Sequence, residues 1–184
     1  MRKKNFLIAL CLPVLVSICT VKVNAQSLSS EDIKAQLVKE WTRAKAYTID
    51  YLNTMPPGKY DFKAVDSIRS FAQQMLHLAG GQVFIMSGIA DAKPPFMRQD
   101  LEKSPGAQSK DSVMYFINAS YDYCISTVKN SDVTKWGEKK QIFGTEENRF
   151  TYMLKAFEHQ THHRGQCTIY IRLLGIRPPN ERLF

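Results

Sequence analysis

The residues best suited to chemistry lie near the C-terminus, between positions 157 and 166. This segment holds His159, His162 and His163, three of the four histidines of the chain. His159 and His163 are four residues apart, and side chains with this spacing lie one above the other on a helix face. Two imidazoles arranged in this way can bind one metal ion, as they do in helical zinc sites. The pattern therefore raises the hypothesis of a histidine metal site.

The spacing of the histidines indicates which of them could be ligands. A helix turns about 100° per residue, so it cannot direct both His162 and His163 at one ion. The fourth histidine, His77, lies in an apolar helical segment, where a polar ring without a partner is costly. We therefore predict His77, His159 and His163 as metal ligands and His162 as a surface residue or a neighbour of the site. The alternative that the pattern leaves open is a pair of partly buried histidines hydrogen-bonded to backbone or carboxylate groups.

The surrounding residues restrict the chemistry. Three neutral imidazoles with open coordination positions are typical of a catalytic rather than a structural metal site. A helical metalloprotease needs glutamate after the first histidine, or before the second in the inverted motif, but these positions hold Gln160 and His162. Protease chemistry is therefore not expected. Cys167 lies one turn beyond His163, and we interpret it as a small buried residue rather than a fourth ligand.

The N-terminus has the pattern of an export signal. Basic residues at positions 2–4 precede an apolar stretch at 6–19, and Val23-Asn24-Ala25 provides small residues for cleavage after Ala25. This stretch is shorter than the ~20 residues that a membrane span needs. We expect residues 1–25 to be removed and residues 26–184 to form one exported domain, periplasmic or extracellular, without stable membrane insertion.

Removal of the signal changes both the charge and the cysteine content. The full chain has a net charge of +8, and the signal carries four basic residues and no acidic one, so the mature chain has +4. The remaining basic residues are scattered, which gives no support to nucleic-acid binding. Two cysteines remain, Cys124 and Cys167, and the sequence leaves open whether they form a disulfide.

Four segments have hydrophobic residues at helical spacing, and none alternates like a strand. The expected helices begin at Ser29 or Ser30, at Asp66 or Ser67, at about Lys110, and after Thr145 as N-cap. They end before Met55-Pro56, at about Ile89, at Lys129 and at Gly175. The pair Gly80-Gly81 inside the second helix allows either close packing or a kink. Four such helices predict an all-α four-helix bundle, and the long connection at 91–109 lets the second and third run parallel.

Taken together, the motifs resemble those of the DinB-like (YfiT-type) superfamily of metal-dependent hydrolases and transferases. The matching segments are Arg69-Ser70-Phe71 before His77, the run from His159 to Gln166, and the closing segment from Tyr170 to Pro179. The resemblance covers essentially the whole mature domain. Cys167 stands where such sequences usually carry an aliphatic residue.

The resemblance implies a bundle of up-down-down-up order and a divalent metal ion, nickel or zinc, bound by His77, His159 and His163 with water completing the coordination. It also implies a small-molecule substrate and association as a homodimer. Some members of the superfamily are transferases that activate a low-molecular-weight thiol on the metal, and many have no assigned activity. We therefore expect an exported metal-dependent hydrolase or group transferase. The alternatives are a non-catalytic metal- or ligand-binding bundle and a purely structural bundle whose histidines bind no metal.

Overall fold

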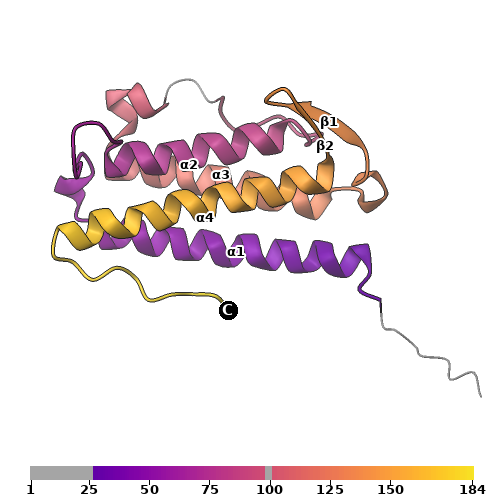
Figure 1. Cartoon of the computed structure of the whole chain (residues 1–184), viewed down its shortest axis with the longest axis horizontal. Helices are drawn as coiled ribbons and strands as arrows, with labels where there is room; N and C mark the ends of the chain where they lie inside the picture. Colours follow the sequence, from indigo (N-terminus) through magenta and orange to yellow (C-terminus); the bar gives the residue numbers. More distant parts are fainter. Residues whose placement is uncertain (1–26, 98–100) are drawn as a thin grey trace, which may run out of the picture.

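The computed structural model describes residues 27–97 and 101–184, and the predicted export signal lies outside this part of the chain. Long helices make up most of the described protein (Figure 1): α1 (Ser30–Thr54), α2 (Phe71–Ser87), α3 (Lys110–Asn130) and α4 (Arg149–Leu173). A hairpin of β1 (Lys139–Ile142) and β2 (Thr145–Asn148) joins α3 to α4. Short 3-10 turns occupy Pro57–Lys59, Leu101–Lys103, Pro105–Ala107 and Val133–Lys135. The protein is mostly helical, as predicted.

Serine side chains determine where α1 and α3 begin. Ser29 caps α1, and its hydroxyl and backbone N–H form a reciprocal capping box with Asp32. Ser109 caps α3 by accepting a hydrogen bond from the backbone N–H of Ser112. Both helices therefore begin and end within about one residue of the positions predicted from the sequence.

Helix α2 begins later than predicted. The sequence analysis placed its start at Asp66 or Ser67, whereas the helix begins at Phe71. Ser70 is the N-cap, and the side-chain oxygen of Gln73 accepts a hydrogen bond from the Ser70 backbone N–H at 2.8 Å. This capping box satisfies the backbone N–H groups of Ser70 and Gln73, so the helix begins there rather than one turn earlier.

The start predicted for α4 was also wrong, because the hairpin precedes it. Thr145, the predicted N-cap, begins strand β2, and Asn148 caps the helix by accepting from the backbone N–H of Thr151 at 2.7 Å. Phe143 and Gly144 form the two-residue turn between the strands, with φ values of 55° and 74°. Positive φ at both positions is the feature of a type I′ hairpin turn.

Side-chain contacts show the direction of the helices. Arg149, at the start of α4, donates to the carbonyl of Ile89, just beyond the end of α2, so these two helices are antiparallel. Tyr51 and Thr168, near the ends of α1 and α4, are joined by a hydrogen bond of 2.8 Å, so these two are parallel. Figure 1 shows α2 and α3 running in the same direction, with the long connection returning between them. The helices therefore follow an up-down-down-up order.

A single apolar core fills the space between the helices. Its largest fully buried side chains include Trp41, Phe71, Met75, Tyr121, Met153 and Ile171. Beyond α4, Gly175 adopts a φ of 72° and stops the helix at the predicted place. The C-terminal segment then returns along α1 (Figure 1), where Arg182 forms an ion pair with Asp50 at 3.0 Å.

Candidate metal centre

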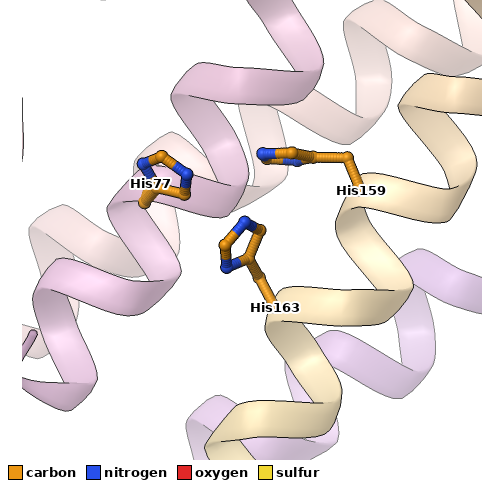
Figure 2. Close-up of side chains that lie close together, drawn as sticks. All are labelled: His77, His159 and His163. Atoms are coloured by element: carbon orange, nitrogen blue, oxygen red, sulfur yellow. The ribbon is translucent and has the colours of Figure 1, made fainter. Parts of the chain in front are cut away.

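The structure brings His77, His159 and His163 together at the interface of α2 and α4. Figure 2 shows the three rings turned toward one another, His77 from α2 and the other two from successive turns of α4. The centroid of the His163 ring lies 4.4 Å from each of the other two centroids, and those of His77 and His159 are 5.3 Å apart. One nitrogen of each ring lies within 4.8 Å of the nitrogens of the others. These are the three residues that the sequence predicted as ligands.

The donor set fits a divalent metal ion. Zinc–nitrogen bonds of about 2.1 Å place two nitrogens of a tetrahedral site about 3.4 Å apart. The rings therefore need to approach one another by at most about 1.4 Å, which small side-chain rotations allow. Burial, together with the neighbouring His159 and His77, lowers the pKa of His163 to about 3. His163 is thus neutral near pH 7, as a metal ligand must be.

A carboxylate supports His77 from the side away from the cluster. Nδ1 of His77 lies 2.5 Å from one carboxylate oxygen of Glu102, and Nε of Arg69 donates to the other at 2.6 Å. Burial by itself raises the pKa of the Glu102 carboxyl, but the hydrogen bonds from Arg69 and His77 outweigh it, so the pKa lies below its ordinary value. A carboxylate in this position makes Nδ1 the protonated nitrogen of His77 and leaves Nε2 for an ion.

Glu102, which lies in the long connection at 91–109, was not predicted as part of the site. The backbone carbonyl of Glu102 accepts hydrogen bonds from the side-chain amides of Gln73 at 3.1 Å and Gln108 at 2.9 Å. These bonds hold the Leu101–Lys103 turn against the start of α2. Only this tertiary contact, twenty-five positions from His77, makes Glu102 part of the site.

Two side-chain amides lie next to Nδ1 of His163. Gln74, which is only 3% exposed, places its amide nitrogen 2.7 Å from Nδ1, and Oε1 of Gln166 lies 3.3 Å from it. The two amides also hydrogen-bond to each other. With the Gln74 amide as donor, Nδ1 of His163 is the acceptor; when Nδ1 instead carries the proton and donates to the oxygen of Gln166, Nε2 has the lone pair that a metal ion needs.

Gly81 provides the space for the His159 ring. A Cβ atom at position 81 would lie 2.2 Å from Cε1 and 2.5 Å from Nε2 of His159. No side chain can be accommodated at such distances unless the ring moves. The close packing that the sequence analysis considered for the Gly80-Gly81 pair is therefore confirmed at Gly81.

His162 and the two cysteines lie outside the cluster. His162 is exposed, and its Nε2 contacts the side-chain amide of Gln166 at 3.1 Å, as expected for a neighbour of the site. Cys124 and Cys167 are both free and fully buried. Burial raises the pKa of each thiol above its ordinary value. Each is therefore protonated near pH 7, which agrees with Cys167 as a small buried residue.

Gln160, at the position where a protease would carry its general base, faces the interior of the bundle. Its side-chain oxygen accepts hydrogen bonds from Arg164 at 2.6 Å and from the Tyr121 hydroxyl at 2.8 Å. Arg164 is itself buried, with its guanidinium 4.7 Å from the centre of the Tyr47 ring. These residues tie α4 to α1 and α3 and do not take part in the histidine cluster.

Two cavities flank the cluster along α2 and α4. One, of about 720 Å³, lies toward the start of α2 and includes Arg69, Gln74, Glu102 and Gln166, which contact the Nδ1 side of the rings or the residues that support them. The other, of about 520 Å³, is mainly apolar and has His159 in its wall. The smaller cavity therefore reaches the cluster itself, at His159, whereas the larger one is lined by residues that support the cluster.

A helical bundle with three clustered imidazoles defines a class of candidate metal proteins, and the comparisons identify the family. A profile of the DinB family matches residues 24–182, nearly the whole chain, so this protein belongs to the DinB family. No curated protein matches the chain. No helix in the described ranges combines the length and the apolar character needed to cross a membrane.

Solved structures with similar folds are also DinB-like. A DinB-like protein from Bacillus cereus has a TM-score of 0.68 at 15% identity, over 80% of this chain and 96% of that one. A protein from Exiguobacterium sibiricum, assigned in its description to the DinB family, has a TM-score of 0.60 at 20% identity, over 78% and 93%. The DinB-like protein YjoA from Bacillus subtilis has 0.58 at 13% identity, over 81% and 96%. At these identities the likeness concerns the fold.

Proposed function

We propose that this DinB-family protein is a metal-dependent hydrolase or group transferase acting on a small molecule, with His77, His159 and His163 as the metal ligands. One observation carries the proposal: three imidazole nitrogens, supplied by two helices that are distant in sequence, lie within 4.8 Å of one another. Imidazole nitrogen suits both zinc and nickel, the two ions that we propose for the site. When bound, such an ion supplies Lewis-acid chemistry and lowers the pKa of a coordinated water or thiol.

The protein's own groups have defined tasks in this proposal. Glu102 orients His77, and the side-chain oxygen of Gln166, as acceptor from Nδ1–H, orients His163, so that the ligand nitrogens face the centre of the cluster. Gly81 keeps the place of His159 clear. Three protein ligands leave coordination positions for a substrate, which is the arrangement of catalytic sites, whereas structural zinc sites use four.

The alternative is a non-catalytic metal- or ligand-binding bundle. It would keep the three histidines but lack a substrate pocket with convergent polar groups, and a filled space beside the cluster would favour it. Cavities of about 720 and 520 Å³ instead flank the histidines, and these volumes are in the range of small-molecule sites. This observation argues against a filled site, and measured turnover distinguishes an enzyme from a ligand-binding bundle.

Metal analysis tests the ligand assignment. We expect about one nickel or zinc ion per chain, by inductively coupled plasma mass spectrometry, in protein expressed with its signal and purified without an affinity tag. His77→Ala and His163→Ala should lose the ion. His162→Ala is the matched control, because it removes an exposed histidine of the same helix and should keep the ion. Metal retained in His163→Ala, or absent from the parent protein, would contradict the assignment.

The catalytic part of the proposal needs its own measurement. The metal-loaded protein should hydrolyse or transfer a group in a panel of small esters, amides and thiol acceptors. The activity should disappear on chelation, return when the ion is restored, and be absent from His163→Ala. A protein that binds one ion per chain but turns over none of these compounds would support the non-catalytic alternative.

Export and oligomeric state also belong to the proposal. We propose cleavage after Ala25, release to the periplasm or the extracellular space, and association as a homodimer. N-terminal sequencing of the exported protein should begin at Gln26, and sedimentation should give twice the mass of residues 26–184. An uncleaved cytoplasmic protein or a monomer would refute the corresponding part.

A further inference from the structure

The smaller cavity beside the cluster has mainly apolar walls supplied by three elements. Helix α2 contributes Ile85, the hairpin contributes Ile142 and Phe143, and α4 contributes Tyr152 together with His159 and His162. Its volume is about 520 Å³, enough for a molecule with one or two rings. Because the proposed ligand His159 forms part of its wall, a molecule in this cavity lies next to the cluster.

The backbone at Phe143 has a conformation that phenylalanine rarely adopts. Its φ of 55° lies in the left-handed region, where asparagine or glycine usually stands at this position of a type I′ turn. The side chain is 63% exposed, and its ring contacts that of Phe84 with a centroid distance of 4.7 Å. An exposed aromatic ring in a strained turn contributes little to folding, so its place at the cavity indicates a role in binding.

The hairpin that carries Phe143 is firmly seated. The Tyr152 hydroxyl accepts a hydrogen bond from the backbone N–H of Ile142 at 3.2 Å and donates to the carbonyl of Thr145. The side chain of Ile142 lies so close to Gly88 that a Cβ there would be 2.3 Å from its Cδ1. The cavity wall is therefore preformed and does not depend on closure around a ligand.

The charges around the two cavities favour different groups of a ligand. At the smaller cavity, Lys155 and Glu158 neutralise each other in an ion pair of 2.7 Å, and the remaining charged residue, Glu147, is acidic. The larger cavity is lined by Arg69, Lys103 and Glu102 and is more polar. The smaller cavity thus offers an uncharged or cationic molecule an apolar surface, and it does not favour an anion.

We propose that the smaller cavity binds an aromatic part of the substrate and directs the polar group next to it toward the cluster. The inference rests on the proposed function, because it takes the reacting group to be placed at an ion held by His77, His159 and His163. It adds the substrate class: a small molecule with an uncharged aryl group attached to the group that reacts. Phe143 and Ile85 are the residues that would select the aryl group.

Two hydroxamates that share a metal-binding group test the inference. Benzohydroxamate and acetohydroxamate differ in the aryl group, and their affinities for the zinc-loaded protein can be measured by isothermal titration calorimetry. We expect the aryl compound to bind at least about tenfold more tightly. Phe143→Asn and Ile85→Ala should each reduce this ratio by about fivefold or more while zinc affinity is unchanged.

Matched controls assign the effect to this cavity. Tyr115→Asn removes an aromatic side chain of the same exposure, 64%, from α3 and should leave the ratio unchanged. Phe143→Asn suits the positive φ of the turn, so its thermal midpoint should not fall. Ile169→Ala alters the larger cavity and should also leave the ratio unchanged.

The outcomes separate the inference from the proposed function. Suppose that both hydroxamates bind in proportion to zinc content and that the ratio of their affinities is the same in the parent, Phe143→Asn and Ile85→Ala. This result overturns the inference and leaves the metal site intact. If the affinity ratio falls in Ile169→Ala and not in Phe143→Asn or Ile85→Ala, the aryl group binds in the larger cavity and the inference is again wrong. Absence of any zinc-dependent binding refutes the proposed function and the inference with it. If Phe143→Asn converts a dimer to a monomer by sedimentation without changing the ratio, the hairpin is an interface and the inference is wrong.

Discussion

The substitution Gly81→Ala should weaken metal binding without unfolding the bundle. The added Cβ would lie 2.2 Å from Cε1 of His159, whereas ordinary contacts begin at 3.4 Å. The imidazole ring must therefore retreat by about 1.2 Å, since the helix backbone at position 81 is held by its neighbours. Metal–ligand distances tolerate only about 0.2 Å of error, so a displacement of this size removes His159 from the coordination.

The expected loss follows from the number of ligands. With His159 displaced, two imidazoles remain, and the affinity should fall by at least about 100-fold, beyond the 10- to 100-fold typical of lost supporting contacts. Stability without metal should change little. Alanine favours a helix over glycine by about 1 kcal/mol, which offsets part of the cost of moving the half-buried ring. The variant therefore separates metal affinity from folding.

Competition with a zinc chelator measures the zinc affinity. Thermal unfolding with and without zinc measures how much bound zinc stabilises the fold. A 100-fold weaker site reduces the stabilisation by saturating zinc by about 2.7 kcal/mol. Gly165→Ala is the matched control, because a Cβ at this exposed position of α4 meets no atom within 4 Å, so zinc affinity should stay unchanged. Tight zinc binding by Gly81→Ala would show that the His159 ring does not use this space when it binds metal, and would refute the reasoning.

Three further predictions concern the residues around the cluster. Glu102→Gln should lower zinc affinity about 10- to 100-fold in chelator competition, because it weakens the orientation of His77. Tyr152→Phe should destabilise the protein by about 1–2 kcal/mol in urea unfolding, because two backbone groups of the hairpin lose their partner. The metal-free protein should lose stability as pH falls from about 6.5 toward 3, because only the unfolded chain protonates His163 in this range. The contribution of His163 to the slope of the unfolding free energy against pH should not exceed about 1.4 kcal/mol per pH unit. The slope should be shallower in His163→Gln.

The parts of the fold that local chemistry determines could be predicted from the sequence. Helices α1 and α3 begin at serine caps, Ser29 and Ser109. Helix α1 ends before Met55-Pro56, and Gly175 terminates α4. The predicted limits of these helix ends agree with the structure. The start of α2 was also readable, since Ser70 followed by Gln73 has the spacing of a capping box, but the earlier Asp66 and Ser67 offered equally good caps. Only the structure shows that the box of Ser70 and Gln73 is the one that forms.

The hairpin could not be predicted, for a physical reason. Its strands have four residues each and lie mostly exposed, so they show no alternation of apolar and polar side chains. The turn gives no warning either, because phenylalanine stands where a type I′ turn usually has asparagine. The strands are held by the Tyr152 hydroxyl, and such a long-range anchor has no signature in the sequence.

The residues of the candidate site also fall into two groups: those that local sequence patterns predict and those that only tertiary contacts reveal. His159 and His163 are readable because helix geometry alone places them together, and His77 because a histidine in an apolar helix needs a partner. Glu102 is not readable, because its role depends on how the long connection lies against α2. Close packing at Gly80-Gly81 was one of two options from the sequence, but the sequence could not show that His159 is the partner of Gly81. The proposed ligands thus come from regular helices, whereas part of the surface that a substrate would meet comes from the connection and the hairpin. Proteins that share this helical frame and its histidines can therefore differ in the molecule they accept, and the test of what this one accepts lies in Phe143 and Ile85 rather than in the proposed ligands.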